Sequence, residues 1–135
     1  MTAVAERPAR LALVGNPNAG KSSLFNQLTG GRAKVANYPG VTVERKQGRL
    51  LGSGIAIVDL PGTYSLSAGS PEEQVAIEAL LGAEHADAVV VLADATAIAR
   101  GLYLVLQVIE TGVPTVLAIN MMDEEKRHDD NPAAA

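Results

Sequence analysis

The feature that most constrains this chain is a glycine-rich pattern, G-x-x-x-x-G-K-[ST], which lies between an apolar run at 11–14 and an amphipathic run at 21–29. The chain matches the pattern without a mismatch at Gly15, Asn16, Pro17, Asn18, Ala19, Gly20, Lys21 and Ser22. It predicts a strand, a tight loop whose backbone amides bind phosphate groups, and a helix. Because the run before the loop shows no alternation, the strand is expected to be buried on both faces of a parallel sheet.

Each part of this loop has an expected role on a nucleoside triphosphate. Gly15 and Gly20 let the backbone wrap closely around the phosphates, and the exposed amides of the loop point at them. Lys21 is predicted to place a positive charge near the β and γ phosphates, and the Ser22 hydroxyl to coordinate Mg²⁺. Ser23, the next residue, is counted with the nucleotide-binding set. The alternative is a strand-to-helix turn with an incidental lysine.

A second block, Asp59-Leu60-Pro61-Gly62, follows the apolar run 55–58. Asp59 is predicted to hold Mg²⁺ through a water molecule. The Gly62 amide is predicted to contact the γ-phosphate, so that hydrolysis releases the loop. By itself this tetrapeptide is an ordinary turn, but its place after a strand and a phosphate loop favours a nucleotide site.

A third block, Asn120-Met121-Met122-Asp123, follows the apolar run 115–119 and is predicted to recognise guanine. The Asp123 carboxylate can accept from both the ring N–H and the exocyclic amine of guanine. Adenine offers neither donor at that edge and would leave a buried charge unpaired. Met121 stands where many GTP-binding proteins have a lysine, which weakens stacking on the base. A helix start with Asp123 as a first-turn acid is the alternative.

The stretch 37–44 between the first two blocks is interpreted as a mobile loop that orders around the γ-phosphate. Thr42 is its natural second hydroxyl ligand for Mg²⁺. The alternative is a plain turn that leads into a strand. The residues of this loop that are predicted to contact the nucleotide are Gly40, Val41, Thr42, Val43 and Glu44.

Apolar runs alternate with amphipathic helical stretches along the chain, which is typical of an α/β fold. We expect a P-loop NTPase fold: a mostly parallel sheet with one antiparallel edge strand and helices on both faces, lacking the last strand and helix. The turn at 52–54 joins 42–51 to 55–58 as the antiparallel pair. Ser70, Pro71 and Glu73 predict the capped start of a helix that Gly82 ends. Further strands are expected at 88–93 and 115–119, with a helix around 102–109.

Composition excludes several functions. The 135 residues carry a net charge of −4, which argues against a nucleic-acid partner. There are no cysteines, so disulfides and thiolate metal sites are excluded. The apolar runs are far shorter than the ~20 residues that span a bilayer, and no signal peptide is expected. Neither His85 nor His128 lies in a pattern typical of a metal site. The expected division is an N-terminal extension at 1–9, a GTP-binding domain at 10–127 and a disordered tail at 128–135.

Across residues 10–126 the sequence resembles the cytosolic GTPase domain of the ferrous-iron transport protein B family. Beyond the three blocks, the resemblance rests on the stretches 21–30, 37–46, 63–66 and 100–106. It implies slow, Mg²⁺-dependent hydrolysis of GTP on the cytosolic side of a membrane iron transporter. It also implies that Asn18 helps to bind K⁺, which supplies the positive charge that other GTPases take from an arginine. Thr63 follows Gly62 where a water-orienting glutamine would favour faster hydrolysis.

The resemblance stops at the third block. Family members continue with a further strand, a guanine-contacting loop, a closing helix and membrane-spanning helices, so this chain is expected to be a fragment whose strand 115–119 is left as an edge. Two other functions stay open. One is a GTP- or GDP-binding sensor with negligible hydrolysis, which Thr63 and the missing element favour. The other is a soluble ribosome-associated GTPase, which the acidic balance disfavours. Arg32 and Arg45 are expected to be solvated surface residues.

Overall fold

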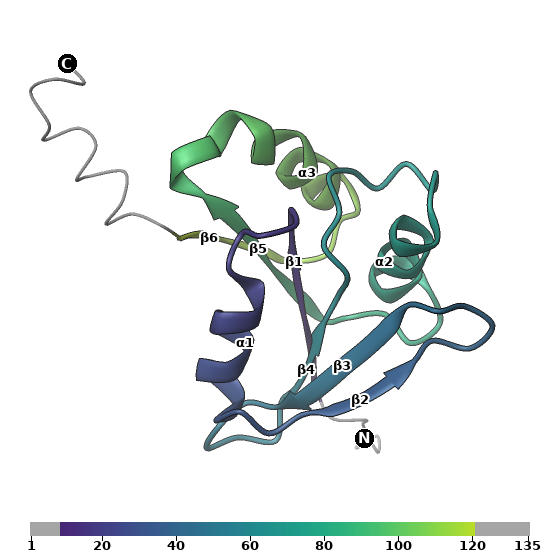
Figure 1. Cartoon of the computed structure of the whole chain (residues 1–135), viewed down its shortest axis with the longest axis vertical. Coiled ribbons are helices and arrows are strands. Elements are labelled where there is room, and N and C mark those ends of the chain that lie inside the picture. Colours follow the sequence, from purple (N-terminus) through teal and green to yellow (C-terminus); the bar gives the residue numbers. More distant parts are fainter. Residues whose placement is uncertain (1–8, 121–135) are drawn as a thin grey trace, which may run out of the picture.

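The computed structural model describes residues 9–120, which fold around one six-stranded sheet (Figure 1). Because the phosphate-loop pattern stands between a buried strand and a helix, it falls at the carboxyl end of a central strand. The elements in chain order are β1 (Arg10–Gly15), α1 (Lys21–Thr29), β2 (Lys34–Asn37), β3 (Glu44–Arg49), β4 (Ala56–Asp59), α2 (Pro71–Leu81), β5 (Ala88–Asp94), a short 3₁₀ turn η1 (Ala95–Ala97), α3 (Ile98–Glu110) and β6 (Thr115–Asn120).

The sheet has the order β2-β3-β4-β1-β5-β6. The strands β4, β1, β5 and β6 run parallel to one another, whereas β3 pairs antiparallel with both β4 and β2. The predicted fold class, a mostly parallel sheet with an antiparallel edge, is confirmed. The strand β2 was not predicted, and it covers the outer side of β3. All four of its residues are exposed, so it has no apolar periodicity that a sequence reading could detect.

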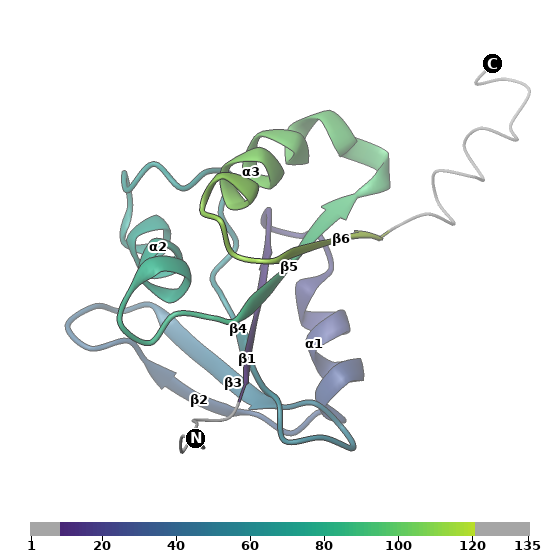
Figure 2. The ribbon, with the colours of Figure 1, turned by 180° about the vertical axis from the view of Figure 1, so that it is seen from behind.

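Helices cover both faces of the sheet: α1 lies on one face, and α2 and α3 lie on the other (Figures 1 and 2). Successive residues of β1 therefore enter different cores. Ala12 and Val14 pack in the core beneath α2 and α3, whereas Leu13 packs with Phe25 of α1. This explains the uninterrupted apolar run of the strand, since each face of a strand covered on both sides needs apolar residues.

The start of α2 agrees with the predicted cap. The Ser70 hydroxyl accepts from the Glu73 amide at 3.1 Å, and Pro71 is the first helical residue. The Glu73 carboxylate accepts from the Gly69 amide at 3.0 Å, so it reaches into the loop that precedes the helix. The helix is thereby tied to the segment that follows the second predicted block.

The described residues contain no helix long and apolar enough to cross a membrane. The strand β6 forms one edge of the sheet over the part of the chain that the structure describes, as predicted for 115–119. Residues 1–8 of the predicted extension, the tail at 128–135, and Met121, Met122 and Asp123 of the third block lie outside the described residues.

Candidate nucleotide-binding site

The predicted phosphate loop forms the wall of a cavity of about 410 Å³ at the carboxyl end of β1. The loop turns into α1 at Gly20, whose φ of 98° is a left-handed conformation that favours glycine. Asn18, at the exposed tip of the loop, is also left-handed, with a φ of 67°. The lining residues are Asn16, Pro17, Asn18, Ala19, Gly20, Lys21, Ser22, Ser23 and Gly62.

Two glycines are required because other atoms approach their Cα closely. A Cβ added to Gly62 would lie 2.9 Å from the Cα of Pro17, so the second block is packed directly against the phosphate loop. A Cβ added to Gly20 would overlap the side-chain amide of Asn120. The Asn120 amide itself donates to the Ala19 carbonyl at 3.1 Å. The first residue of the predicted guanine block is therefore attached to the phosphate loop.

Lys21 and Asp59 meet at the bottom of the site. The Lys21 Nζ lies 2.9 Å from the Asp59 Oδ1, and the two side chains are only 11% and 9% exposed. The pairing of β1 with β4 places Asp59 beside Leu13, which brings the end of β4 next to the start of the phosphate loop. The Asp59 carboxylate and the Ser22 hydroxyl are hard oxygen donors of the kind that Mg²⁺ prefers, so the donor set fits this ion.

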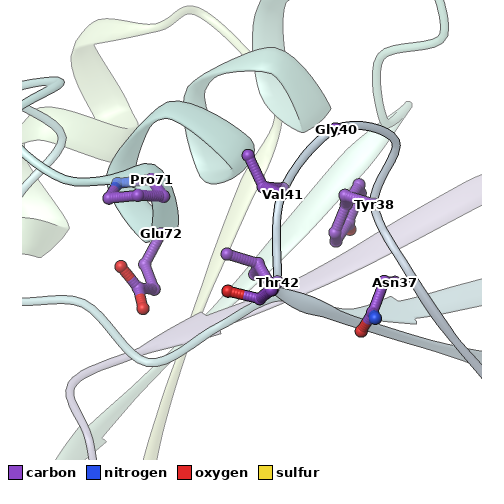
Figure 3. A pocket seen from close by; sticks show the side chains of 8 residues that line it. Asn37, Tyr38, Gly40, Val41, Thr42, Pro71 and Glu72 are labelled. Carbon is purple, nitrogen blue, oxygen red and sulfur yellow. The ribbon is translucent and has the colours of Figure 1, made fainter.

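Thr42 lies away from the phosphate cavity. It lines a second cavity of about 580 Å³ between the 37–43 loop and the start of α2. Figure 3 shows the Thr42 side chain pointing toward α2, on the side where the Glu72 carboxylate stands. The residues that line this second cavity are Asn37, Tyr38, Gly40, Val41, Thr42, Val43, Pro71 and Glu72. The structure thus does not bring Thr42 together with Ser22 and Asp59.

Local hydrogen bonds hold the 37–43 loop in this position. The Tyr38 amide donates to the Val43 carbonyl at 2.9 Å, and Gly40 turns the loop with a φ of 80°. The Arg45 guanidinium lies over the Tyr38 ring, 5.9 Å from its centre. Burial raises the pKa of the Tyr38 hydroxyl, and the Arg45 charge partly opposes this rise. Val43 is buried, while Glu44 begins β3 as an exposed residue.

Thr63 is buried, with 4% of its surface exposed. Its amide donates to the Gly15 carbonyl at 3.1 Å, which attaches the segment after Gly62 to the phosphate loop. Its hydroxyl has no hydrogen-bond partner within residues 9–120. Thr63 is thus enclosed by the protein and is not one of the residues that line the phosphate cavity.

Two side chains that hold the segment after Gly62, Glu73 and Gln107, could not be assigned this role from the sequence. The Glu73 carboxylate accepts from the Ser65 hydroxyl, the Ser67 amide and the Gly69 amide. These hydrogen bonds, the one from Ser65 above all, lower the pKa of Glu73. The second contact joins the Leu66 amide to the Gln107 Oε1 of α3 at 2.7 Å. No local pattern could predict it, because the two residues are 41 positions apart.

Other candidate residues take ordinary positions. Arg32 is exposed, and Arg45 is occupied by the contact with Tyr38. The His85 Nδ1 lies 3.0 Å from the Ala86 carbonyl oxygen, and His128 lies outside the described residues. The part of the chain that the structure describes contains no group of three or more His, Cys, Asp or Glu residues that could hold a metal ion.

The family model described as "Ferrous iron transport protein B" matches residues 9–131. The Fe(2+) transporters FeoB of Salmonella typhimurium and Escherichia coli are each 48% identical over 119 residues. The match covers 84% of this chain and 15% of each transporter, so this chain spans a small part of their length.

Solved structures of the same family superpose closely on this chain. A mutant of S. thermophilus NFeoB bound to mGDP has a TM-score of 0.87 and 47% identity, over 93% of this chain and 48% of that one. The G domain of the T. maritima FeoB iron transporter has a TM-score of 0.82 and 45% identity, over 90% of this chain and 77% of that one. The cytosolic domain of L. pneumophila FeoB has a TM-score of 0.82 and 46% identity, over 90% of this chain and 49% of that one. The match of the family model over residues 9–131 and the 48% identity to the FeoB transporters show that the chain belongs to the ferrous iron transport protein B family.

Proposed function

We propose that this chain binds GTP and GDP with Mg²⁺ and hydrolyses GTP slowly, as the nucleotide-binding domain of a ferrous-iron transporter. The observation that carries the proposal is the convergence of Lys21, Asp59 and the Asn120 amide on one phosphate loop. The related S. thermophilus structures bound to GDP and mGDP support it. The predicted domain, residues 10–127, would be the binding unit.

Magnesium would be held by the Ser22 hydroxyl and by Asp59, the latter through a water molecule. The ion would neutralise charge on the β and γ phosphate oxygens. Before it can do so, Lys21 has to give up its contact with Asp59, because the two side chains neutralise one another at 2.9 Å. Lys21 then turns to the phosphates. Thr42 would join as the second hydroxyl ligand after the 37–43 loop leaves α2.

Guanine specificity would come from Asn120 and Asp123. Asn120 already donates to Ala19, so it holds the end of β6 against the phosphate loop and fixes the distance between base and phosphates. Asp123, three residues further on, would accept from the two donors of guanine. Met121 and Met122, between these two residues, would also contact the nucleotide.

Hydrolysis is expected to be slow because the residue after Gly62 does not orient a water molecule. The buried Thr63 side chain supports this expectation. Asn18 stands at the exposed tip of the loop and lines the phosphate cavity, which is a suitable place to help bind K⁺. A K⁺ ion there would add positive charge at the phosphates, as an arginine does in other GTPases.

The wider role would be regulation of iron uptake at the cytosolic face of a membrane, in contact with the transporting part of the protein. The family membership and the likeness to a cytosolic domain of L. pneumophila FeoB support this role. A sensor that binds GTP and GDP without turnover is the second candidate. The burial of Thr63 favours such a sensor, because the residue after Gly62 would then offer no side chain that activates water.

Titration of fluorescent GDP and a fluorescent GTP analogue into the purified chain, with Mg²⁺ and with ATP as competitor, tests the proposal. We expect micromolar binding that ATP does not displace. The Asp123→Asn variant should lose guanine selectivity. Asp87→Asn serves as the matched control that keeps it, because Asp87 is exposed and precedes β5 at the opposite edge of the sheet. Single-turnover hydrolysis with K⁺ and with Na⁺ then separates the GTPase from the sensor. Displacement by ATP at equal concentration would refute guanine recognition.

A further inference from the structure

The segment 62–70, which follows Asp59 and leads into α2, is attached to the rest of the molecule along most of its length. Thr63 is bonded to Gly15 of the phosphate loop at one end. Toward the other end, the Glu73 carboxylate accepts hydrogen bonds from Ser65, Ser67 and Gly69. Between them, the Leu66 amide donates to the Gln107 Oε1 at 2.7 Å, and the Leu66 side chain packs on the core under α2 and α3. Gln107 is the attachment that comes from α3.

One residue of this segment is strained. Ala68 is exposed and has a φ of 60°, a left-handed conformation that a residue with a Cβ adopts at a cost. Ala68 and Asn18 are the two non-glycine residues with positive φ in the described chain. The Glu73 carboxylate accepts from the Ser67 and Gly69 amides on either side of Ala68, and Gln107 accepts from Leu66, so these hydrogen bonds hold the segment in this strained form.

We propose that Gln107 is a positioning residue that holds the segment 62–70 in its present conformation despite the strain at Ala68. This conformation binds a nucleoside triphosphate less well than a diphosphate. The inference rests on the proposed function. A γ-phosphate has to draw the Gly62 amide toward itself, and Gly62 is packed on Pro17 in the present conformation. A diphosphate makes no such demand, because it lacks the γ-phosphate. A shift of Gly62 toward a γ-phosphate would pull on the segment and stretch the hydrogen bond between Leu66 and Gln107.

Two substitutions should therefore act in opposite directions on the preference for triphosphate. Gln107→Met removes the acceptor and keeps the shape of the side chain, so the segment is released and the affinity for triphosphate rises relative to that for diphosphate. Ala68→Gly relieves the strain of the present conformation and so stabilises it, which lowers the same ratio. A neutral hydrogen bond and a left-handed alanine each correspond to about a twofold to tenfold change.

The test measures the dissociation constants of GDP and of a β–γ imido GTP analogue for the whole chain and its variants. We expect Gln107→Met to shift the ratio of the two constants toward the triphosphate, and Ala68→Gly to shift it toward the diphosphate. Gln107→Glu keeps an oxygen acceptor for Leu66 and should stay close to the parent chain. Two matched controls, Gln27→Met on the exposed side of α1 and Ala83→Gly in an exposed loop of negative φ, should leave the ratio unchanged.

Thermal unfolding without nucleotide shows that each variant is folded and gives a second readout: Ala68→Gly should raise the Tm, and Ala83→Gly should not. Equal ratios in all variants, or shifts of the same sign from Gln107→Met and Ala68→Gly, would overturn the inference. If the parent chain binds neither nucleotide, the proposed function fails instead, and the two failures are thereby distinguished.

Discussion

The contact between Gly20 and Asn120 gives the sharpest prediction. Gly20 adopts a φ of 98°, and a Cβ at this position would overlap the Asn120 amide that donates to Ala19. The Gly20→Ala substitution therefore has two costs. The left-handed backbone costs an alanine about 1–2 kcal/mol. Displacing the Asn120 amide forfeits a hydrogen bond between the end of β6 and the phosphate loop, which costs about 1 kcal/mol more.

Gly31 supplies the matched comparison. It has a φ of 81°, and a Cβ there would meet no atom within 4 Å. Gly31→Ala should therefore lower the free energy of unfolding by the backbone term alone, about 1–2 kcal/mol. Gly20→Ala should lower it by about 1 kcal/mol more. Urea unfolding of both variants without nucleotide, with fluorescence and circular dichroism as readouts, measures the difference.

A double-mutant cycle isolates the contact with Asn120. In an Asn120→Ala background the side-chain amide is gone, so Gly20→Ala should cost no more than Gly31→Ala does in the parent chain. Equal costs for the two glycine substitutions in the parent chain would refute the reasoning. So would a cost of Gly20→Ala that Asn120→Ala leaves unchanged.

Three further predictions concern charge and packing. Lys21→Ala should weaken binding of GDP and of the GTP analogue at least tenfold in a fluorescence titration, since it removes the cation beside the phosphates; unchanged affinity would place the phosphates elsewhere. The pKa of Glu73 is lowered from its ordinary value of 4.5, so its contribution to stability is present above pH 4.5 and is lost as pH falls through the folded pKa. The Tm measured between pH 3 and pH 6 should therefore depend less on pH in the Glu73→Gln variant than in the parent chain. Phe25→Ala empties a fully buried position and should cost about 3–5 kcal/mol in urea unfolding, whereas Leu81→Ala, 58% exposed, should cost far less.

Thr42 and the 37–43 loop line a different cavity from the one beside the phosphate loop. The 37–43 loop is stabilised by its own turn and by the Tyr38–Arg45 contact. None of these contacts involves the phosphate loop. If Thr42 binds Mg²⁺ as proposed, the loop has to leave its present position, and nucleotide binding would then choose between two positions of the loop.

The sequence alone determined the main architecture and the place of the site. The apolar runs of β1, β4 and β5 are continuous because helices cover both faces of the sheet there, so they predict parallel strands. The run of β6 is equally apolar, although Val116, Leu117 and Ile119 are exposed at the edge of the described sheet. Parallel strands end at the same edge of the sheet, which explains why blocks at 15–22, 59–62 and 120 lie together although they are far apart in the chain. The cap of α2 was also predictable, because Ser70, Pro71 and Glu73 act within one turn.

The tertiary structure decided what local patterns cannot encode. The strand β2 is exposed and has no periodicity, so only its pairing with β3 defines it. The contacts of Gln107 with Leu66 and of Asn120 with Ala19 join residues 41 and 101 positions apart. The position of Thr42, across a cavity from the start of α2, follows from how the 37–43 loop lies in the folded chain. The sequence specifies which chemical groups reach the site, because strand ends and loop glycines are local features. Which groups touch depends on long-range packing, since that is what sets the distances between segments remote in sequence.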